Sequence, residues 1–176
     1  MQAKTFEMEF AKFIQRFSEE IKESFLQDAF DQREILAHYR LGKNILEELA
    51  SNILSEFTRN VDRRTHVELI ADEYMKMGLN CHEEQLSSAE VIRVFILLKR
   101  HIWLFFQESN FAGQPFDVRS IVALNNRIAL FFDRAMYYFL VGFEEAEDEE
   151  SSELEVLYRK LLSRIRRDLG IPQPGQ

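Results

Sequence analysis

The chain has few cysteine, proline and glycine residues, and each shortage excludes a class of architecture. Its 176 residues include 1 Cys, 3 Pro and 6 Gly. The single thiol, Cys81, cannot form an intrachain disulfide, so we expect a reducing, cytoplasmic location and not a disulfide-stabilised secreted scaffold. Turn-forming residues are too sparse for an all-β sandwich or barrel, which needs a turn signal about every 8–12 residues.

Long apolar runs are also missing. The charge-free stretch from Ala135 to Phe143 has nine residues, whereas a membrane-spanning helix needs about 20. Near the start, Lys4 is followed by Glu7 and Glu9 instead of the apolar segment of a signal peptide. The sequence therefore predicts a protein with no membrane span.

Apolar and aromatic residues are abundant, and their spacing is helical. Hydrophobic residues make up 46% of the chain, which contains 16 Phe. The first series repeats every three or four residues with charged residues between, which predicts one amphipathic helix: Phe6, Phe10, Phe13, Phe17, Ile21 and Phe25. We expect an all-α fold, a globin-like or helical bundle of about six to seven helices with two central apolar helices.

Three further patterns divide the first half of the chain. Helical spacing from Ile35 to Phe57 continues through Gly42, which is either a close-packing point in one long helix or a helix end. A stripe from Val61 to Met77 stops at Gly78, which predicts a helix C-cap, followed by a loop over Leu79–Leu86. Ser87 and Glu90 then form a capping-box pattern that predicts a helix start.

The two central helices are predicted over Ala89–Phe106 and Val118–Phe143, where apolar residues cover most of the circumference. A turn containing Gly113 and Pro115 separates them. With the preceding helices they make up a predicted sensory or regulatory domain over residues 1–143.

Charge divides the rest of the chain. Residues 144–153 carry a formal charge of −7, which predicts an extended acidic linker. Residues 154–169 are predicted to form a terminal amphipathic helix within a segment of charge +3, and residues 170–176 a disordered tail. The apolar stripe of this helix is a candidate partner-binding seam: Leu154, Leu157, Tyr158, Leu161 and Ile165. Packing back on the bundle and binding to an anionic membrane are the alternatives.

Motifs for metal and nucleotide chemistry are missing. The sequence has no Glu-x-x-His pair, no paired Cys/His spacing for zinc and no glycine-rich phosphate loop, so we predict no metal, no cofactor and no catalytic residues. Asp62 and His66, at helical spacing, fit a solvated surface pair better than metal ligands. Arg33 and His38 resemble the Arg-x4-His signature of HEPN-type ribonucleases, whose Arg and His act on the scissile phosphate, and this leaves an enzyme as one alternative.

His101 continues the buried stripe of the first central helix. A lone histidine among aromatic residues is either a core side chain that hydrogen-bonds locally or an axial haem ligand. The aromatic residues around it are either simple core or the wall of a ligand pocket. The candidate ligand-binding residues are His101, Trp103, Phe105, Phe131 and Tyr138.

One stretch resembles a known family. Residues 86–102, Leu-Ser-Ser-Ala-Glu-Val-Ile-Arg-Val-Phe-Ile-Leu-Leu-Lys-Arg-His-Ile, are similar to the core of the RsbRD-type N-terminal regulatory domain. Such domains precede STAS domains in stressosome co-antagonists, and similar ones precede bacterial sensor histidine kinases. The resemblance implies a haem-free, globin-like input domain that dimerises, and it transfers no catalytic residue.

Together these patterns predict a non-catalytic sensory domain that binds a ligand or a signalling protein, forms a homodimer and signals through its C-terminal helix. The formal charge of −8 disfavours nucleic acid as a partner. A small helical adaptor and a HEPN-like ribonuclease are the alternatives.

Overall fold

The computed structural model describes residues 2–35, 41–60, 67–109 and 118–168, and all of the regular structure in them is α-helix. Side chains are described for residues 9–31, 41–60, 70–109, 118–148 and 156. The helices are α1 (Gln2–Arg16), α2 (Ser18–Ile35), α3 (Lys43–Asn60), α4 (Val67–Glu83), α5 (Ser88–Glu108) and α6 (Val118–Asp168). The predicted all-α class is confirmed.

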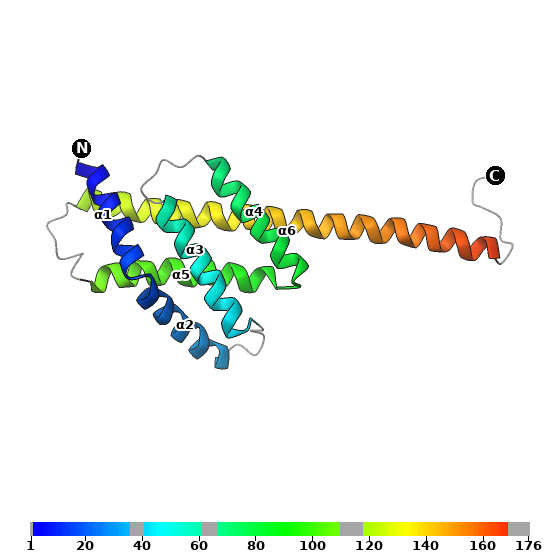
Figure 1. The fold of residues 1–176 in the computed structure, drawn as a ribbon, viewed down its shortest axis with the longest axis horizontal. Helices are drawn as coiled ribbons and strands as arrows, with labels where there is room; N and C mark the ends of the chain where they lie inside the picture. Colours follow the sequence, from blue (N-terminus) through cyan, green and yellow to red (C-terminus); the bar gives the residue numbers. More distant parts are fainter. Residues whose placement is uncertain (1, 36–40, 61–66, 110–117, 169–176) are drawn as a thin grey trace.

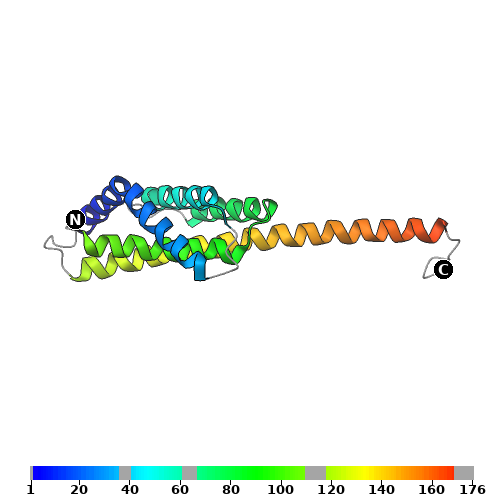
Figure 2. The ribbon, with the colours of Figure 1, turned by 90° about the horizontal axis from the view of Figure 1, so that it is seen from below.

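The described helices form two layers. Helices α5 and α6 lie side by side and antiparallel, and α3 and α4 lie over them (Figures 1 and 2). Helix α4 packs mainly on α6, whereas α2 packs on α3 and α5, and α1 packs on α3. Beyond the body, α6 continues alone to the far end of the described chain (Figure 1).

The core is rich in phenylalanine, as the periodic stripes predict. Phe10 of α1 contacts Phe57 of α3 and Phe106 of α5, at ring-centroid distances of 6.3 and 5.7 Å. Phe57 also lies 5.6 Å from Phe132 of α6. Because edge-on and tilted aromatic pairs add to the gain from burial, these contacts hold the two layers together.

The first predicted helix is divided in two. Phe10, Phe13, Ile21 and Phe25 are buried as expected, but helix assignment is interrupted at Phe17 between α1 and α2. The Phe17 amide still donates to the Phe13 carbonyl and the Ile21 amide to the Phe17 carbonyl, at 3.1 and 3.0 Å. The chain bends between α1 and α2 (Figure 2), while its apolar stripe continues across the bend.

Gly42 lies directly before α3, so of the two alternatives for this residue the one long helix through it is wrong and a helix boundary is what the structure shows. Its carbonyl accepts the first hydrogen bond of α3 from the Leu46 amide at 3.1 Å. A Cβ added at Gly42 would meet no atom within 4 Å, so close packing is not its role.

Gly78 lies inside α4 and is buried, so the prediction that it caps a helix is also wrong. A Cβ there would lie 2.7 Å from the Phe143 amide nitrogen of α6. This glycine therefore allows close contact between two helices and does not end one. The predicted loop over Leu79–Leu86 shrinks to a turn after Glu83, where Gln85 has a φ of 56°.

Helix α5 begins where the sequence predicts. The Glu90 and Val91 amides both donate to the Ser87 carbonyl at 3.1 Å, which places Ser87 at the N-cap. The Ser87 hydroxyl makes no side-chain capping hydrogen bond, so the position is confirmed but the capping box is not.

Helix α6 corrects the predicted division of the C-terminal part. Residues 144–153 are helical, and α6 runs unbroken to Asp168, so there is no extended acidic linker. Glutamate is a good helix former, and extending an existing helix gains one hydrogen bond per residue. Repulsion between exposed like charges costs only about 0.2–0.5 kcal/mol per pair, which is too little to break the helix.

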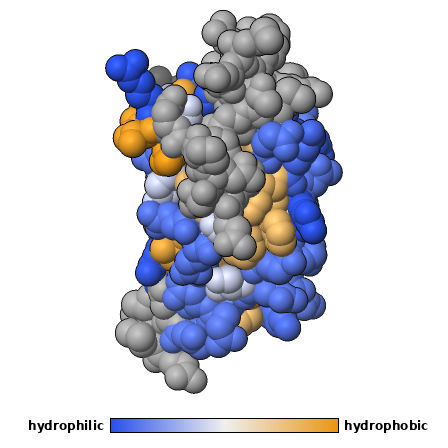
Figure 3. All heavy atoms as spheres, turned by 90° about the vertical axis from the view of Figure 1, so that its left-hand side faces the viewer, coloured by the Kyte–Doolittle hydropathy of each residue, from blue (hydrophilic) through white to orange (hydrophobic). Residues whose placement is uncertain are grey.

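At one end of the molecule the described surface is mostly hydrophilic (Figure 3). Figure 3 shows one end of the molecule, where hydrophobic side chains form separate patches among hydrophilic ones. Larger apolar side chains are exposed along α6 itself: Leu130 is 49% and Tyr137 62% exposed, and Leu140 is also exposed. No helix among the described residues is long and apolar enough to cross a membrane.

Candidate ligand groove and output helix

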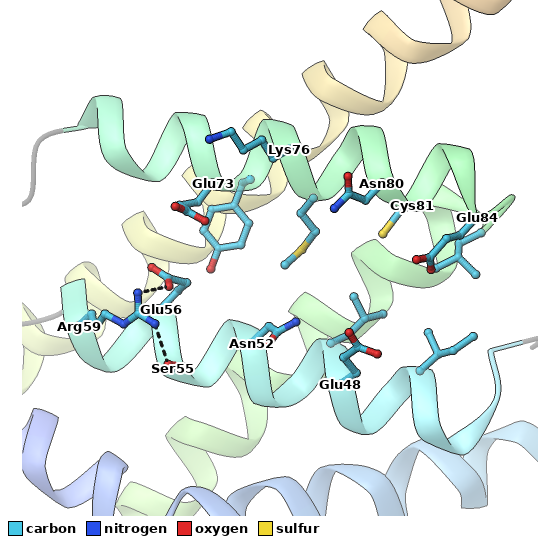
Figure 4. A pocket seen from close by; sticks show the side chains of 15 residues that line it. Glu48, Asn52, Ser55, Glu56, Arg59, Glu73, Lys76, Asn80, Cys81 and Glu84 are labelled. Atoms are coloured by element: carbon cyan, nitrogen blue, oxygen red, sulfur yellow. Dashed lines mark hydrogen bonds and ion pairs between the residues drawn. The ribbon is translucent and has the colours of Figure 1, made fainter.

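A groove separates α3 from α4. Its volume is about 450 Å³, and the two helices make little direct contact with each other. They run antiparallel along it, as the order of the labelled residues in Figure 4 shows. Along α3 the lining extends from Ile45 to Arg59, which corresponds to about 21 Å at 1.5 Å per residue.

Acidic side chains dominate the charge of this groove. Its lining includes Glu48, Glu56, Glu73 and Glu84 but only two cations, Arg59 and Lys76. Both cations are already engaged by carboxylates. Arg59 Nη1 lies 2.7 Å from Glu56 Oε1, and Lys76 Nζ lies 2.7 Å from Asp72 Oδ2. Uncompensated negative charge therefore remains on the groove.

Glu48 and Glu84 lie at the same end of the groove, one on α3 and one just beyond the end of α4 (Figure 4). Neither they nor Glu73 forms a salt bridge with another described residue. Asn52 and Asn80 line the middle from opposite helices, and the apolar lining includes Ile45, Leu49, Met77 and Leu86. The groove combines an anionic end with an apolar floor.

Tyr74 is a buried part of the groove wall with an unused hydroxyl. The residue is 1% exposed, and its hydroxyl has no hydrogen-bond partner among the described residues. Its ring is fixed by edge contacts with Phe95 and Phe131 at 5.6 and 6.0 Å. Burial raises the pKa of the hydroxyl far above its ordinary value, and the charges of Glu56 and Glu73 raise it further. A buried donor without an acceptor costs about 1–3 kcal/mol, so an atom that accepted a hydrogen bond from this hydroxyl would recover that cost.

Cys81 also lines the groove, and its thiol is buried. Burial, with a smaller contribution from Glu84, raises the pKa of this thiol to about 11. At neutral pH it is protonated and weakly nucleophilic, so it belongs to the wall and is not a reactive centre.

The opposite side of α4 contacts α6 backbone to backbone. A Cβ at Gly142 would lie 2.7 Å from both the carbonyl carbon and the Cα of Met75, and closer still to the Met75 carbonyl oxygen. Gly78 makes the matching approach from α4. One turn later, His82 contacts Phe143 at 5.1 Å between ring centroids. These contacts lie where α6 leaves the body, since Gly142 is buried and Glu144 and Glu145 are exposed.

His101 lies away from the groove, in a polar cluster between α5 and α2. Its Nδ1 is 3.1 Å from Ser24 Oγ and its Nε2 is 3.1 Å from Asp28 Oδ2. Because a carboxylate only accepts, Nε2 donates to Asp28. The hydrogen-bonded core histidine is thus the alternative that the structure shows, since both ring nitrogens are occupied by protein partners.

Ser24, His101 and Asp28 include the residue types of a hydrolase triad, but their setting differs. Ser24 and Asp28 are one turn apart within α2, where backbone amides are used by the helix. An oxyanion hole needs free donors beside the nucleophile. The cluster therefore fits a polar clamp between α2 and α5.

The other predicted ligand-binding residues do not converge on one site. Trp103 stacks on Phe106 at 5.3 Å, and Phe105 contacts Phe17, between α1 and α2, at 5.5 Å. Phe131 faces Phe57, whereas Tyr138 lies beside Tyr137. None of the predicted five lines the groove or the smaller cavity of about 180 Å³ between α2 and α3.

Several predicted residues lie outside the described part. The side chains of Leu154, Leu157, Tyr158, Leu161 and Ile165 are not described, although their backbone is helical. His38, Asp62 and His66 lie outside the described residues, as does the side chain of Arg33. Among described residues no group of three His, Cys, Asp or Glu could hold a metal ion.

The groove was missed in the sequence because its residues have ordinary helical patterns. The polar side of α3 has the composition of a solvated face, and Tyr74 fits the apolar stripe of α4. Gly78 and Gly142, 64 residues apart, were the available signal, since an unexplained glycine within helical periodicity often marks close packing.

Comparison with protein-family models, with curated proteins and with solved structures found no match to this chain.

Proposed function

We propose that this chain is a non-catalytic regulatory domain that binds a ligand in the α3–α4 groove and transmits the event through α6. The glycine contact between α4 and α6 is the observation that carries the proposal. Helix α4 forms one wall of the groove and, on its other side, touches the backbone of α6 at its exit from the body. The resemblance to RsbRD-type input domains supports the same function.

The mechanism is a shift between two packings of α4 on α6. A ligand that holds α3 and α4 at a different separation favours one packing by its difference in affinity for the two. Because the backbones of α4 and α6 are in direct contact at Gly78 and Gly142, α4 cannot move without moving α6 or breaking the contact. The unbroken helix then carries the displacement to the segment beyond Phe143.

A groove-filling substitution tests this relay. Asn80 lines the groove and is exposed, so Asn80→Trp places a large side chain between α3 and α4. We expect altered amide hydrogen exchange in α6 from residue 140 onwards. Glu83→Trp adds the same side chain on α4 at an exposed position outside the groove and should leave this exchange unchanged. Equal exchange in both variants and the wild type would reject the relay.

The exposed face of α6 favours a second candidate function, an interaction module that pairs with another copy of this chain. Leu130, Tyr137 and Leu140 are exposed. They share a seven-residue frame with the predicted seam, since Leu140 precedes Leu154 by 14 residues and Tyr137 precedes Tyr158 by 21. Parallel pairing would place the −7 charge of residues 144–153 beside the same charge in the second copy. Antiparallel pairing instead places the predicted seam over residues 154–165 of each copy beside Leu130, Tyr137 and Leu140 of the other copy.

Sedimentation of the full chain distinguishes this arrangement. Tyr137→Glu should convert an antiparallel dimer to monomer, whereas Asn126→Glu, at an exposed polar position of α6, is the matched control. A monomeric wild type at high micromolar concentration, or a dimer unaffected by Tyr137→Glu, would count against antiparallel pairing. RNA cleavage by the purified protein, lost in His38→Ala, would favour the ribonuclease alternative instead.

A further inference from the structure

We infer that the α3–α4 groove binds an organic cation with an apolar body, held at its charged end by Glu48 and Glu84. This inference rests on the proposed function, because it names the ligand class for the groove through which that function acts. It depends on three separate properties of the groove: its negative charge, its apolar lining and the buried hydroxyl of Tyr74.

Charge decides the sign of the ligand. Glu48 and Glu84 stand at one end of the groove on facing elements (Figure 4), and neither is neutralised by a described cation. Arg59 and Lys76, the cations of the lining, are held by Glu56 and Asp72 at 2.7 Å. An anionic ligand would meet net repulsion, whereas an ammonium or guanidinium group would gain two carboxylates.

The floor decides the body of the ligand. Leu49 and Met77 line the groove from opposite helices, with Ile45 and Leu86 near the acidic end. Methionine adapts its shape to different apolar partners and is common at binding surfaces that accept varied ligands. A hydrated inorganic cation would leave this surface unused, so the cation should carry a hydrocarbon or aromatic body.

Tyr74 provides the independent evidence that a ligand completes the groove. Its side chain forms part of the wall, is 1% exposed and has a hydroxyl without a partner among the described residues. Buried polar groups are almost always hydrogen-bonded, so an unpaired one beside a cavity points to a missing acceptor. A ligand with a carbonyl or ether oxygen along its body would supply that acceptor.

A matched probe series tests the ligand class on the full chain. Phenethylamine, phenethyl alcohol and hydrocinnamate share one phenethyl body but end in an ammonium, a hydroxyl and a carboxylate. We expect the chemical-shift changes of groove residues to saturate with phenethylamine. The dissociation constants of phenethyl alcohol and hydrocinnamate should be at least tenfold larger. N-(5-aminopentyl)acetamide carries a carbonyl at the end of its chain remote from the amine, so it should bind more tightly than octylamine, which has a chain of the same length without the amide.

Variants locate the binding. Glu48→Gln combined with Glu84→Gln should weaken phenethylamine binding about tenfold, because two exposed ion pairs with the ammonium are removed. Glu83→Gln removes a neighbouring exposed charge outside the groove and should have no effect. Tyr74→Phe should erase the advantage of N-(5-aminopentyl)acetamide over octylamine. A synthetic peptide of residues 154–168, which is basic and amphipathic in sequence, tests whether the cation comes from a protein helix.

The outcomes separate this inference from the proposed function. Amine-selective binding lost in the Glu48/Glu84 double variant supports the ligand class, whether or not α6 responds. If that binding leaves hydrogen exchange in α6 unchanged, the relay fails while the ligand class stands. Equal binding of hydrocinnamate and phenethylamine, or amine binding that survives the double variant, overturns the ligand class.

Discussion

Replacing Gly142 with alanine probes the contact on which the proposed relay depends. The new Cβ would lie 2.7 Å from two backbone atoms of Met75, and nearer to a third. A flexible side chain could rotate away from such a contact, but the backbone of α4 cannot. The two helices must therefore separate where α6 leaves the body.

Two opposing effects set the size of the change. Alanine is favoured over glycine in a helix interior by about 1 kcal/mol. Overpacking costs about 1–3 kcal/mol, and a displaced backbone places this case at the upper end. We expect Gly142→Ala to lower the free energy of unfolding by about 2 kcal/mol. For a chain of this size, this corresponds to a fall in Tm of about 4–8 °C.

Denaturant and thermal unfolding followed by circular dichroism measure this change. Gly42→Ser is the matched control, because a Cβ at Gly42 meets no atom within 4 Å and serine is favoured at a helix N-cap. Gly78→Ala should also destabilise, and the double variant should cost less than the sum, since one separation relieves both clashes. A Gly142→Ala protein about 1 kcal/mol more stable than wild type would refute the close contact.

Four further predictions follow from the described residues. Tyr74→Phe should raise the free energy of unfolding by about 1 kcal/mol, because it removes an unpaired buried hydroxyl and keeps the ring. A lower free energy of unfolding in a denaturant titration would contradict this. Burial raises the pKa of Cys81 to about 11, so the rate of its alkylation should rise with pH up to about 11. The stability that the protonated thiol contributes should be lost between about pH 9 and 11. An alkylation rate that stops rising near pH 9 would contradict this prediction. His101→Ala should cost at least about 2 kcal/mol in thermal unfolding, because it leaves a cavity and a broken polar clamp; Ser24→Ala, at an exposed position, should cost less. Glu147→Pro should reduce helicity but leave the Tm of the body within about 2 °C, since Glu147 is exposed beyond the buried part of α6; a large fall in Tm would argue that the body includes this segment.

Much of the fold could be predicted because its helices are amphipathic. Apolar periodicity predicts the buried faces of α1 to α5, and Ser87 marks the start of α5 correctly. The errors concern glycine and charge. Gly78 has the same local sequence signal whether it ends a helix or touches another, and only the position of α6 decides between these roles.

The acidic segment, residues 144–153, could not be assigned correctly from its charge alone. Dense like charge predicts an extended chain when local repulsion is considered alone, but residues 144–153 extend a helix already nucleated in the core. Of the two alternatives for His101, the structure shows the hydrogen-bonded core side chain, whose partners Ser24 and Asp28 lie more than 70 residues away in the sequence. The groove depends on how far apart α3 and α4 stand, which no periodicity specifies.

The most direct test of the relay is a distance measurement across the exit of α6. Spin labels would be placed at Ile96 of α5 and Val156 of α6, both 49% exposed, with Cys81 replaced by serine. Val156 lies 13 residues beyond Phe143, or about 20 Å along the helix, so a tilt of about 6° at the glycine contact moves the label by about 2 Å. Asn80→Trp should shift the distance distribution by at least about 2 Å, and Glu83→Trp should not. Identical distributions in all three proteins would contradict the claim that the groove controls α6.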